Sequence, residues 1–479
     1  MRSFAPKIVW ISALFLFQTV LTEQAKAEAV TLYNQHCATC HGSQRYGGYA
    51  PPLVPNAISR HNSQDLIRIM TAGLPSTQMP EFQQKLKPAE IQSLATWLQT
   101  PVQVTEWGDR EIRESHQTYP AREPLKVSLT SREEILLIVE RGSGSIHIYD
   151  GKTMNRLDQF FVGNIHGGPK FDDHYESIYA VTRDGIIAGY DLKNWQMRSM
   201  VQVAQNTRNI AISPDNQWVV AANLLPQNLV FLDRNLKLVK TLPLEGKPAA
   251  IYHLHHRPAF LVAFTDLPSL LLITYNQTEI QTESIPLPEP FQDLSLIPEK
   301  PWILASLREG NRVNLYDLEQ RKILGEIKTE GLPHLFSAAF FMKDHKIHAA
   351  LNHIGLAKIS LITLEPFEVV KQVGVKGSGF FIRTHANNPW LWLDSNTDTI
   401  QLIRKDNFEL HTVELQPQSG KKAMHIEFTA DGKEAFVSIW DPAGAVVIYD
   451  ARTLQEKQRI PFNMPIGKYN AYNKTFFPL

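Results

Sequence analysis

The sequence is poor in cysteine, in net charge and in long hydrophobic runs. Only two cysteines occur in 479 residues, so no structural disulfide competes for them. The 48 basic and 48 acidic residues give a formal net charge of +0. That balance argues against a protein that binds nucleic acid or an anionic membrane surface. No glycine-rich phosphate loop and no nucleophile triad stands out, so neither chemistry is indicated.

The apolar run at the N-terminus is too short for a comfortable membrane span. It covers residues 8–20, follows the positive Arg2 and Lys7, and precedes the small residues around Ala25-Lys26-Ala27. This pattern predicts a secretory signal peptide over residues 1–27, and an uncleaved anchor is the alternative. Either way the next segment lies outside the cytoplasm. We therefore expect a periplasmic protein with no membrane span after cleavage.

The two cysteines lie in the motif Cys37-Ala38-Thr39-Cys40-His41. This spacing lets both thiols reach the vinyl groups of one porphyrin, and it brings the His41 imidazole to the iron as proximal ligand. A zinc site would need a second ligand pair at fixed spacing. The motif therefore predicts covalent haem c held by Cys37 and Cys40.

Residues 28–105 have a helical rhythm with loops between the helices. Helices are expected over 31–37, 65–71 and 88–98, with Ser63 as the cap of the second. This order resembles the small class I cytochromes c, so we expect an all-α cytochrome c domain.

The sixth iron ligand is expected between the last two helices, at Met79 in Gln78-Met79-Pro80. A thioether ligand raises the reduction potential, which suits electron acceptance. The alternative is that Met79 only packs. Met70 lies among apolar neighbours in a helix and is expected in the core.

From residue 128 to 479, short β-branched and aromatic runs alternate with turns, and a strand that ends in aspartate recurs. Examples are Ser145–Asp150, Ile186–Asp191, Asn228–Asp233, Val313–Asp317 and Ala445–Asp450. Spacings near about 40 residues are typical of a β-propeller, and about 350 residues fill roughly eight blades. We predict an all-β eight-bladed propeller over 128–479. Residues 106–127 are expected as the linker, and 122–127 could also form the first strand.

A propeller alone does not name a function. A c-type haem domain followed by an eight-bladed propeller resembles the haem d1 proteins, namely the cytochrome cd1 nitrite reductases and their relatives in haem d1 biosynthesis. The segments that carry this resemblance are Val139–Ser145, Gly163–His166, Tyr179–Gly185, Asn206–Asn209, Gly331–His334, Phe381–His385 and Pro465–Asn473.

The resemblance implies roles for five residues of the propeller. His166 would be the proximal ligand of the haem d1 iron. Arg183 and Arg208 would contact the carboxylates of the macrocycle, since guanidinium forks bind carboxylates bidentately. His334 and His385 would be the active-site histidines. The alternatives are a loop histidine at 166, surface salt bridges for the arginines, and core histidines at 334 and 385.

One segment separates the branches of this family. His425 in Ala423–Phe428 departs from what we expect of the reductases and resembles the distal histidine ligand of the dehydrogenases that act on dihydro-haem d1. The alternative is a strand histidine that faces the core. A short N-terminal domain, with little before the Cys-His motif, supports the dehydrogenase branch.

This branch implies oxidation of a propionate of dihydro-haem d1 to an acrylate, which completes haem d1. Electrons would pass to haem c and then to a periplasmic acceptor, and His334 or His385 would take the proton from carbon. Nitrite reductase or other haem d1 biosynthesis proteins are possible partners. A cytochrome cd1 nitrite reductase and a non-catalytic haem d1 carrier are the alternatives.

The run His253-Leu254-His255-His256 could also bind a metal. It lies in a strand-to-turn region and precedes Arg257-Pro258, so incidental surface histidines are the favoured interpretation.

Overall fold

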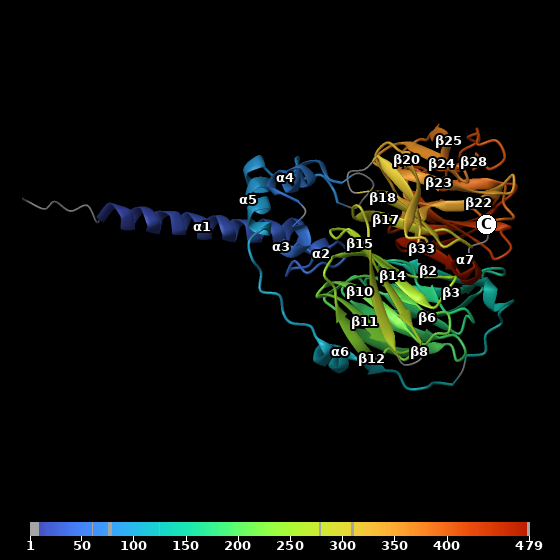
Figure 1. Ribbon diagram of the computed structural model, residues 1–479, viewed down its shortest axis with the longest axis horizontal. Helices are drawn as coiled ribbons and strands as arrows, with labels where there is room; N and C mark the ends of the chain where they lie inside the picture. Colours follow the sequence, from blue (N-terminus) through green and yellow to red (C-terminus); the bar gives the residue numbers. More distant parts are fainter. Residues whose placement is uncertain are drawn as a thin grey trace, which may run out of the picture. The chain divides into compact units, whose positions relative to one another are not determined.

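The computed structural model describes residues 9–59, 61–74, 79–123, 125–276, 279–307 and 311–476. The chain forms two compact units, residues 1–106 and residues 107–479 (Figure 1). Within the described residues, an all-α unit is followed by an all-β propeller of eight blades, as predicted. Among the helices in the described residues, none combines the length and apolarity needed to cross a membrane.

The first unit is built from helices that pack around a small apolar core. Its helices are α1 (Val9–His36), α2 (Ala38–His41), α3 (Pro55–Ile58), α4 (Ser63–Ala72) and α5 (Pro88–Leu98). The core draws its buried side chains from α1, α4 and α5, including Tyr33, Leu66 and Leu94. The predicted helix over 88–98 is confirmed, the one over 65–71 lies within α4, and residues 31–36 form the last part of the longer α1.

The cap of α4 is Asn62, so the expected cap at Ser63 was wrong by one residue. Asn62 Oδ1 accepts a hydrogen bond from the Asp65 amide at 2.9 Å, and Asp65 Oδ2 accepts one from the Asn62 amide at 3.2 Å. This reciprocal pair satisfies two amides that the first helical turn would leave without partners.

The second unit consists of eight sheets within the described residues, each forming one blade. From the inner strand outward, the first four blades are β33 (Pro465–Asn470), β2 (Ile135–Glu140), β3 (Ser145–Asp150), β4 (Arg156–Phe161); β5 (Lys170–Phe171), β6 (Ser177–Val181), β7 (Ile186–Asp191), β8 (Gln196–Gln202); β9 (Asn206–Ile212), β10 (Val219–Leu225), β11 (Gln227–Leu232), β12 (Leu238–Pro243); and β13 (Pro248–His253), β14 (Ala259–Phe264), β15 (Ser269–Tyr275), β16 (Ile280–Pro286).

The other four blades follow in chain order. They are β17 (Phe291–Leu296), β18 (Trp302–Leu307), β19 (Arg312–Asp317), β20 (Lys322–Lys328); β21 (Leu332–Pro333) and β22 (Ala339–Lys343) on β23 (Lys346–Ile354), then β24 (Lys358–Leu364), β25 (Phe367–Gly374); β26 (Ile382–Arg383), β27 (Trp390–Asp394), β28 (Ile400–Arg404); and β29 (Ala423–Phe428), β30 (Glu434–Ile439), β31 (Gly444–Asp450), β32 (Glu456–Phe462). Short helices η1 (Arg132–Glu134), η2 (Leu335–Ser337) and α7 (Ala471–Thr475) lie between or after strands.

The aspartate that recurs in the sequence ends the third strand of a blade or directly follows it. Asp150 Oδ1 accepts hydrogen bonds from the amides of Lys152 and Thr153 at 2.8 and 3.0 Å. Asp450 Oδ1 makes the same pair with the amides of Arg452 and Thr453. The carboxylate thus closes the turn into the fourth strand, which explains why the repeat carries aspartate there.

The innermost strands surround a central channel that has two ends. Adjacent inner strands such as β9 and β13, or β29 and β33, contact one another. We call the end where the inner strands begin the N-rim, and the end where they finish the C-rim. Because each blade is an antiparallel meander, the turn between its second and third strands also lies at the N-rim.

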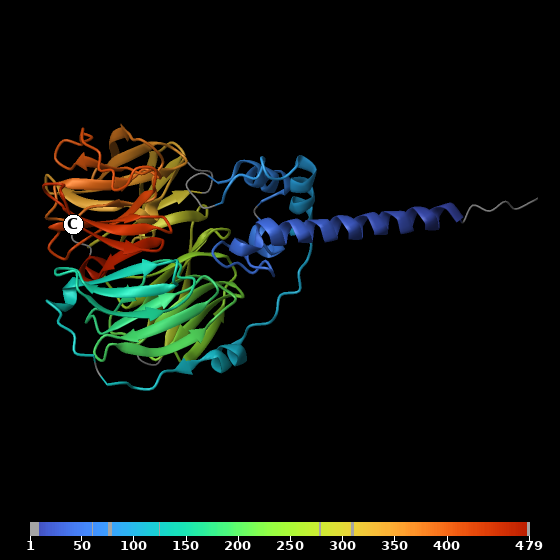
Figure 2. The ribbon, with the colours of Figure 1, turned by 180° about the vertical axis from the view of Figure 1, so that it is seen from behind.

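The first and last strands of the propeller pair within one blade. β33 is antiparallel to β2, with Ile138 opposite Lys468. In Figures 1 and 2 the red C-terminal strands lie beside the teal first strands. The last strand of the chain therefore closes the ring of blades by pairing with the first strand of the propeller.

The segment expected as a linker is anchored to the propeller over much of its length. Trp107 Nε1 donates to the Gln202 carbonyl at 3.2 Å, and the buried Ile112 of α6 (Asp109–Ser115) packs into the core of the second and third blades. β1 (Gln117–Thr118) then pairs with β8.

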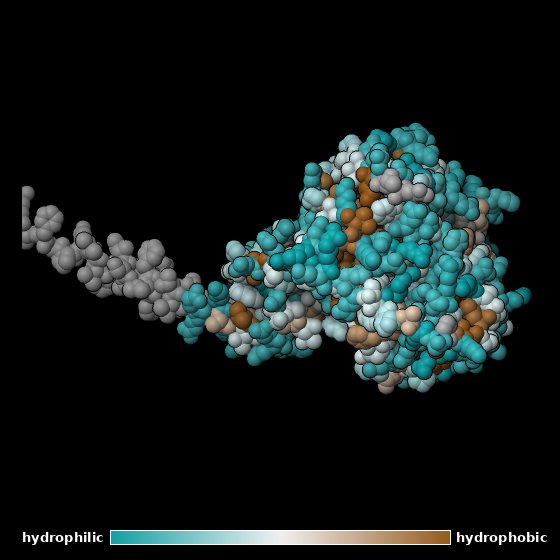
Figure 3. Space-filling model, turned by 90° about the horizontal axis from the view of Figure 1, so that it is seen from below, coloured by the Kyte–Doolittle hydropathy of each residue, from teal (hydrophilic) through white to brown (hydrophobic). Residues whose placement is uncertain are grey.

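Most of the described surface in the view of Figure 3 is hydrophilic, and the apolar residues lie in separate patches. The large apolar side chains with the greatest exposure, Phe161, Val413 and Phe476, come from different parts of the chain.

Candidate functional site

The Cys-His motif lies where α1 ends and the single-turn helix α2 begins. Cys37 precedes α2, and Cys40 and His41 lie on it. The His41 ring is 9% exposed, and its Nδ1 donates to the Pro51 carbonyl at 2.8 Å. A histidine fixed through Nδ1 presents Nε2 to a metal. With a half-buried and an exposed thiol beside it, the motif fits a covalently held haem.

Met79 lies in the loop between α4 and α5 and is partly buried against the core. The loop is held by hydrogen bonds from the Leu74 amide to the Met79 carbonyl at 3.1 Å and from the Phe82 amide to the Met70 carbonyl at 2.9 Å. Met70 itself is 6% exposed within the core, as predicted. Met79 remains our predicted sixth ligand.

Met79→Ala should remove the sulfur-to-iron charge-transfer absorption of the ferric haem and lower the reduction potential, because a thioether ligand raises it. Visible spectra and a redox titration measure both effects. Met342→Ala is the matched control, since Met342 is 44% exposed on the propeller. An unchanged spectrum and potential in the Met79 variant would assign the ligand to another residue.

At the N-rim, backbone pairing brings His166 and Arg183 together. The His166 amide donates to the Val181 carbonyl at 3.0 Å, and the Arg183 amide donates to the Asn164 carbonyl at 3.2 Å. The loop before β5 is thereby joined to the turn between β6 and β7. As a result, an Arg183 guanidinium nitrogen hydrogen-bonds His166 Nε2.

Arg208 joins this pair from the next inner strand. The Thr207 amide donates to the Arg183 carbonyl at 2.9 Å, which ties β9 to the turn that carries Arg183. Arg208 Nε donates to the Ala249 carbonyl at 2.6 Å. Three of the predicted residues therefore lie together, although they come from two blades.

This group carries positive charge that the protein leaves largely uncompensated. Arg183 is 9% exposed, and burial together with Arg208 and Arg141 lowers its pKa to about 9. Among the described residues it makes no ion pair with a carboxylate, and its buried Nε has no hydrogen-bond partner. A buried guanidinium without an anion is costly, so this arrangement fits a ligand that brings carboxylates.

The His166 ring is neutral in this setting. Burial lowers its pKa well below the usual range, and the charges of Arg183 and Arg208 lower it further. A neutral imidazole can donate a lone pair to iron.

His425 lies on the inner strand β29 at a β-bulge, in the half of the strand nearer the N-rim. The register shifts between Met424 and Ile426, and His425 has a φ of 51°. Bulges commonly redirect a side chain at a functional site. The ring is 3% exposed and packs against Phe381 and Tyr469 at centroid distances of 4.8 and 5.1 Å.

A buried lysine supports the His425 bulge. Lys468 Nζ donates to the His425 carbonyl and, at 2.6 Å, to Ser438 Oγ. Burial, followed by the charges of Lys468 and Arg383, lowers the His425 pKa well below the usual range. His425 Nδ1 accepts a long hydrogen bond from the Lys468 amide at 3.4 Å. Coordination through Nε2 therefore needs the ring to turn and give up this contact, because the neutral ring carries its proton on Nε2 as placed.

His334 lies at the N-rim, directly after β21. Its Nδ1 lies 3.0 Å from the Phe380 carbonyl, which can only accept, and 3.0 Å from Ser337 Oγ, which itself donates to that carbonyl. Both contacts place the proton on Nδ1. The lone pair is then on Nε2, which makes this nitrogen a proton acceptor. Burial raises the pKa of the half-buried Asp293, and the charge of Arg208 acts in the opposite direction.

His385 is not part of this group. It follows β26 at the C-rim, where Nε2 bonds the Ala430 carbonyl at 3.1 Å and Nδ1 accepts from the Asn387 amide at 3.1 Å. Both ring nitrogens serve turns of the backbone, so the geometry favours the alternative of a core histidine. The two histidines expected to share one active site lie at opposite ends of the inner strands.

The sequence reasoning missed Asp394, which connects the N-rim groups. Its Oδ1 accepts from the amides of Phe380 and Phe381 at 2.6 and 3.3 Å, and its Oδ2 accepts from the His425 amide at 3.4 Å. Burial raises its pKa to about 6. Asp394 thereby positions the loop that orients His334 and the bulge that carries His425. No sequence motif marks it, because its partners are backbone amides of other segments.

The histidines of the run 253–256 do not form a metal site. His253 Nε2 bonds Tyr275 Oη at 2.7 Å, and within the described residues no cluster of three or more metal-ligating side chains occurs.

Comparison with known families gives two matches that divide the chain as the fold does. Residues 130–474 match the model of the cytochrome D1 heme domain, and residues 24–98 match that of cytochrome c oxidase, cbb3-type, subunit III.

Comparison with individual proteins finds similarity along nearly the whole chain. It is 34% identical to dihydro-heme d1 dehydrogenase of Pseudomonas aeruginosa, over 96% of this chain and 97% of that protein. A nitrite reductase of Stutzerimonas stutzeri is 20% identical over 95% of this chain and 94% of its own length. Protein NirF of Pseudomonas aeruginosa is 22% identical, over 69% of this chain and 89% of its own. The solved structure of dihydro-heme d1 dehydrogenase NirN in complex with DHE superposes with a TM-score of 0.77 and 33% identity, covering 93% of this chain and 99% of that one.

Proposed function

The chain belongs to the cytochrome D1 heme domain family, and on this basis we propose that it converts dihydro-haem d1 to haem d1 by oxidising a propionate side chain to an acrylate. The observation that carries the proposal is the 34% identity to a dihydro-heme d1 dehydrogenase, which extends over both the cytochrome unit and the propeller. The protein acts in the periplasm, and residues 1–27 are a signal peptide removed on export.

The N-rim residues bind and orient the substrate. Arg183 and Arg208 pair with carboxylates of the macrocycle. This pairing neutralises the buried charge of Arg183, which has no carboxylate partner among the described residues. His166 provides a neutral imidazole to the iron of the substrate from one face, and His425 provides one from the other. Four side chains from three blades thus fix the plane of the ring.

The reaction removes two protons and two electrons from the propionate. His334 is the base for the proton on carbon, because its Nδ1 is held by a carbonyl and its Nε2 carries the lone pair. His385 is not proposed as the base, since both of its nitrogens serve the backbone. Haem c, which Cys37, Cys40 and His41 would hold with Met79 as the sixth ligand, would supply a one-electron acceptor for each of two successive electrons, and an external periplasmic acceptor would reoxidise it between them. The first proton passes from His334 to solvent, so that His334 can take the second.

A nitrite reductase is the second candidate, favoured by the similarity to such an enzyme over 95% of the chain. The two functions make opposite demands on the iron. Nitrite reduction needs an open coordination position, whereas a ring held between His166 and His425 has none.

Purified protein that carries haem c should convert added dihydro-haem d1 to haem d1, and it should reduce nitrite negligibly under the same conditions. Absorption spectroscopy follows the macrocycle, and nitrite consumption is measured in parallel. A Cys37→Ala, Cys40→Ala variant should still bind the macrocycle, because its N-rim is intact, but it should not turn over. Sustained nitrite reduction by the unmodified protein would favour the reductase, and binding without any conversion would favour the carrier.

A further inference from the structure

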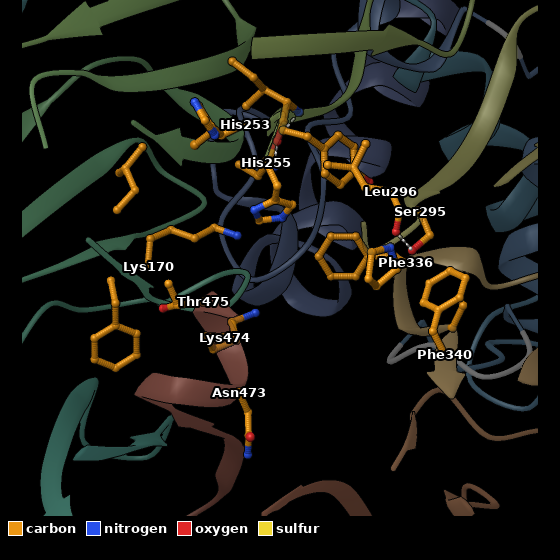
Figure 4. A pocket seen from close by; sticks show the side chains of 18 of the residues that line it. Lys170, His253, His255, Ser295, Leu296, Phe336, Phe340, Asn473, Lys474 and Thr475 are labelled. Atoms are coloured by element: carbon orange, nitrogen blue, oxygen red, sulfur yellow. Dashed lines mark hydrogen bonds between the residues drawn. The ribbon is translucent and has the colours of Figure 1, made fainter. Parts of the chain in front are cut away.

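The C-rim of the propeller channel contains a pocket that the proposed function does not use. It is lined by the last residues of several inner strands and by α7 (Figure 4). None of the N-rim residues His166, Arg183 and His425 lines it.

The pocket is lined by five basic residues from different segments, namely Lys170, His253, His255, Arg383 and Lys474. Lys170 comes from β5, His255 from the turn after β13, and Lys474 from α7, and Figure 4 shows all three directed into the same space. Neither lysine makes an ion pair with a carboxylate among the described residues. Lys474 Nζ instead lies 5.2 Å from the centroid of the Tyr469 ring.

The basic groups lie close enough to repel one another. Burial lowers the pKa of Lys170, and burial followed by the charge of Lys170 lowers the pKa of Lys474 well below the usual range. His255 is affected in the same direction by burial, His256 and Lys170. Like charges crowded in a partly desolvated space favour an anion between them.

Two acidic residues, Glu427 and Asp173, also line the pocket. Glu427 is 4% exposed, and its Oε1 accepts from the Phe428 amide at 2.9 Å and from Asn473 Nδ2 at 3.1 Å. Burial raises its pKa, and the charges of Arg383 and Lys474 act in the opposite direction. The Asp173 residue is largely exposed, but partial burial of its carboxyl group, followed by the charge of Asp172, raises its pKa.

The other wall of the pocket is aromatic. Phe336 is 45% exposed although it is a large apolar side chain, and Phe340 and Leu296 lie beside it (Figure 4). Exposed aromatic surface in a concavity opposite a few convergent polar groups is typical of a site for a small organic ligand.

We propose that the C-rim pocket binds a small organic anion, in which a carboxylate pairs with Lys170 and Lys474 and a flat apolar body packs on Phe336 and Phe340. The proposal rests on the geometry of the pocket and is independent of the reaction at the N-rim.

Isothermal titration of the full-length protein with haem c attached tests this site with three probes. Phthalate carries carboxylates on a flat ring and should bind, inorganic phosphate has the charge without the ring and should bind at least 10-fold more weakly, and benzamide has the ring without the charge and should not bind. Equal affinity for phosphate and phthalate would overturn the aromatic wall as part of the site.

Variants then locate the binding. Lys170→Gln with Lys474→Gln should weaken phthalate binding by 10-fold or more, whereas Lys170→Arg with Lys474→Arg should retain it. Lys193→Gln is the matched control, because Lys193 lies outside the channel and pairs with Glu176 at 2.7 Å. Phthalate affinity that is unchanged in the double glutamine variant, or that is lost in Arg183→Gln instead, would place the probe at the N-rim and overturn the proposal.

Discussion

His166→Ala should lower the affinity for the d1-type macrocycle by about 100-fold or more while haem c stays attached. Partners in the second shell of a metal ligand are themselves worth about 10- to 100-fold in affinity, and His166 is proposed as the ligand itself. The variant also removes the hydrogen-bond partner of Arg183, which leaves that buried guanidinium less well satisfied. Absorption titration of the haem c-loaded protein measures the affinity.

The neighbouring His174 gives a matched control. It is exposed on the turn after β5, so His174→Ala should bind the macrocycle as tightly as the unmodified protein. Equal affinity for His166→Ala and His174→Ala would remove His166 from the site.

His425→Ala should convert the bound haem d1 from a low-spin to a high-spin spectrum and open its iron to small anions. The reason is that a six-coordinate iron with two imidazoles has no vacancy, and removing one ring creates it. Visible spectra with and without added cyanide or nitrite measure the change. The whole population of bound haem d1 should change spin state, because the other N-rim residues still bind the macrocycle and only the distal ligand is missing.

His385→Ala serves as the comparison for this variant. Its ring bonds turns at the C-rim, so its removal should leave the haem d1 spectrum unchanged even where it lowers stability. A low-spin spectrum that persists in His425→Ala would show that the distal position is not held by His425.

The parts of the fold that could be predicted from sequence are those that local chemistry determines. The recurring aspartates marked strand ends correctly, because the carboxylates of Asp150 and Asp450 accept from the amides two and three residues later. The cap of α4 was misplaced by one residue, because Asn62 and Ser63 are both good caps and only the reciprocal bond with Asp65 separates them.

The site was harder to predict because it depends on contacts between distant segments. His334 and His385 both follow short inner strands, yet one lies at the N-rim and the other at the C-rim. In one blade the inner position is shared by β21 and β22 with η2 between them, so His334 follows β21 near the start of that position. In the next blade β26 is the whole inner strand, so the turn that carries His385 follows its end. Asp394 and Asp293 were missed for a related reason, since each bonds amides of a separate inner segment.

The pairing of β33 with β2 has a consequence for the order in which the protein is made. The cytochrome unit contains only residues up to 106, so it can finish folding before the propeller is complete. The propeller cannot close until its last strand arrives, because β2 has no inner neighbour before then. Lys468, which supports the bulge of His425, lies on that last strand. A C-terminally truncated chain would therefore keep the residues that hold haem c but lack the complete cradle that receives the macrocycle.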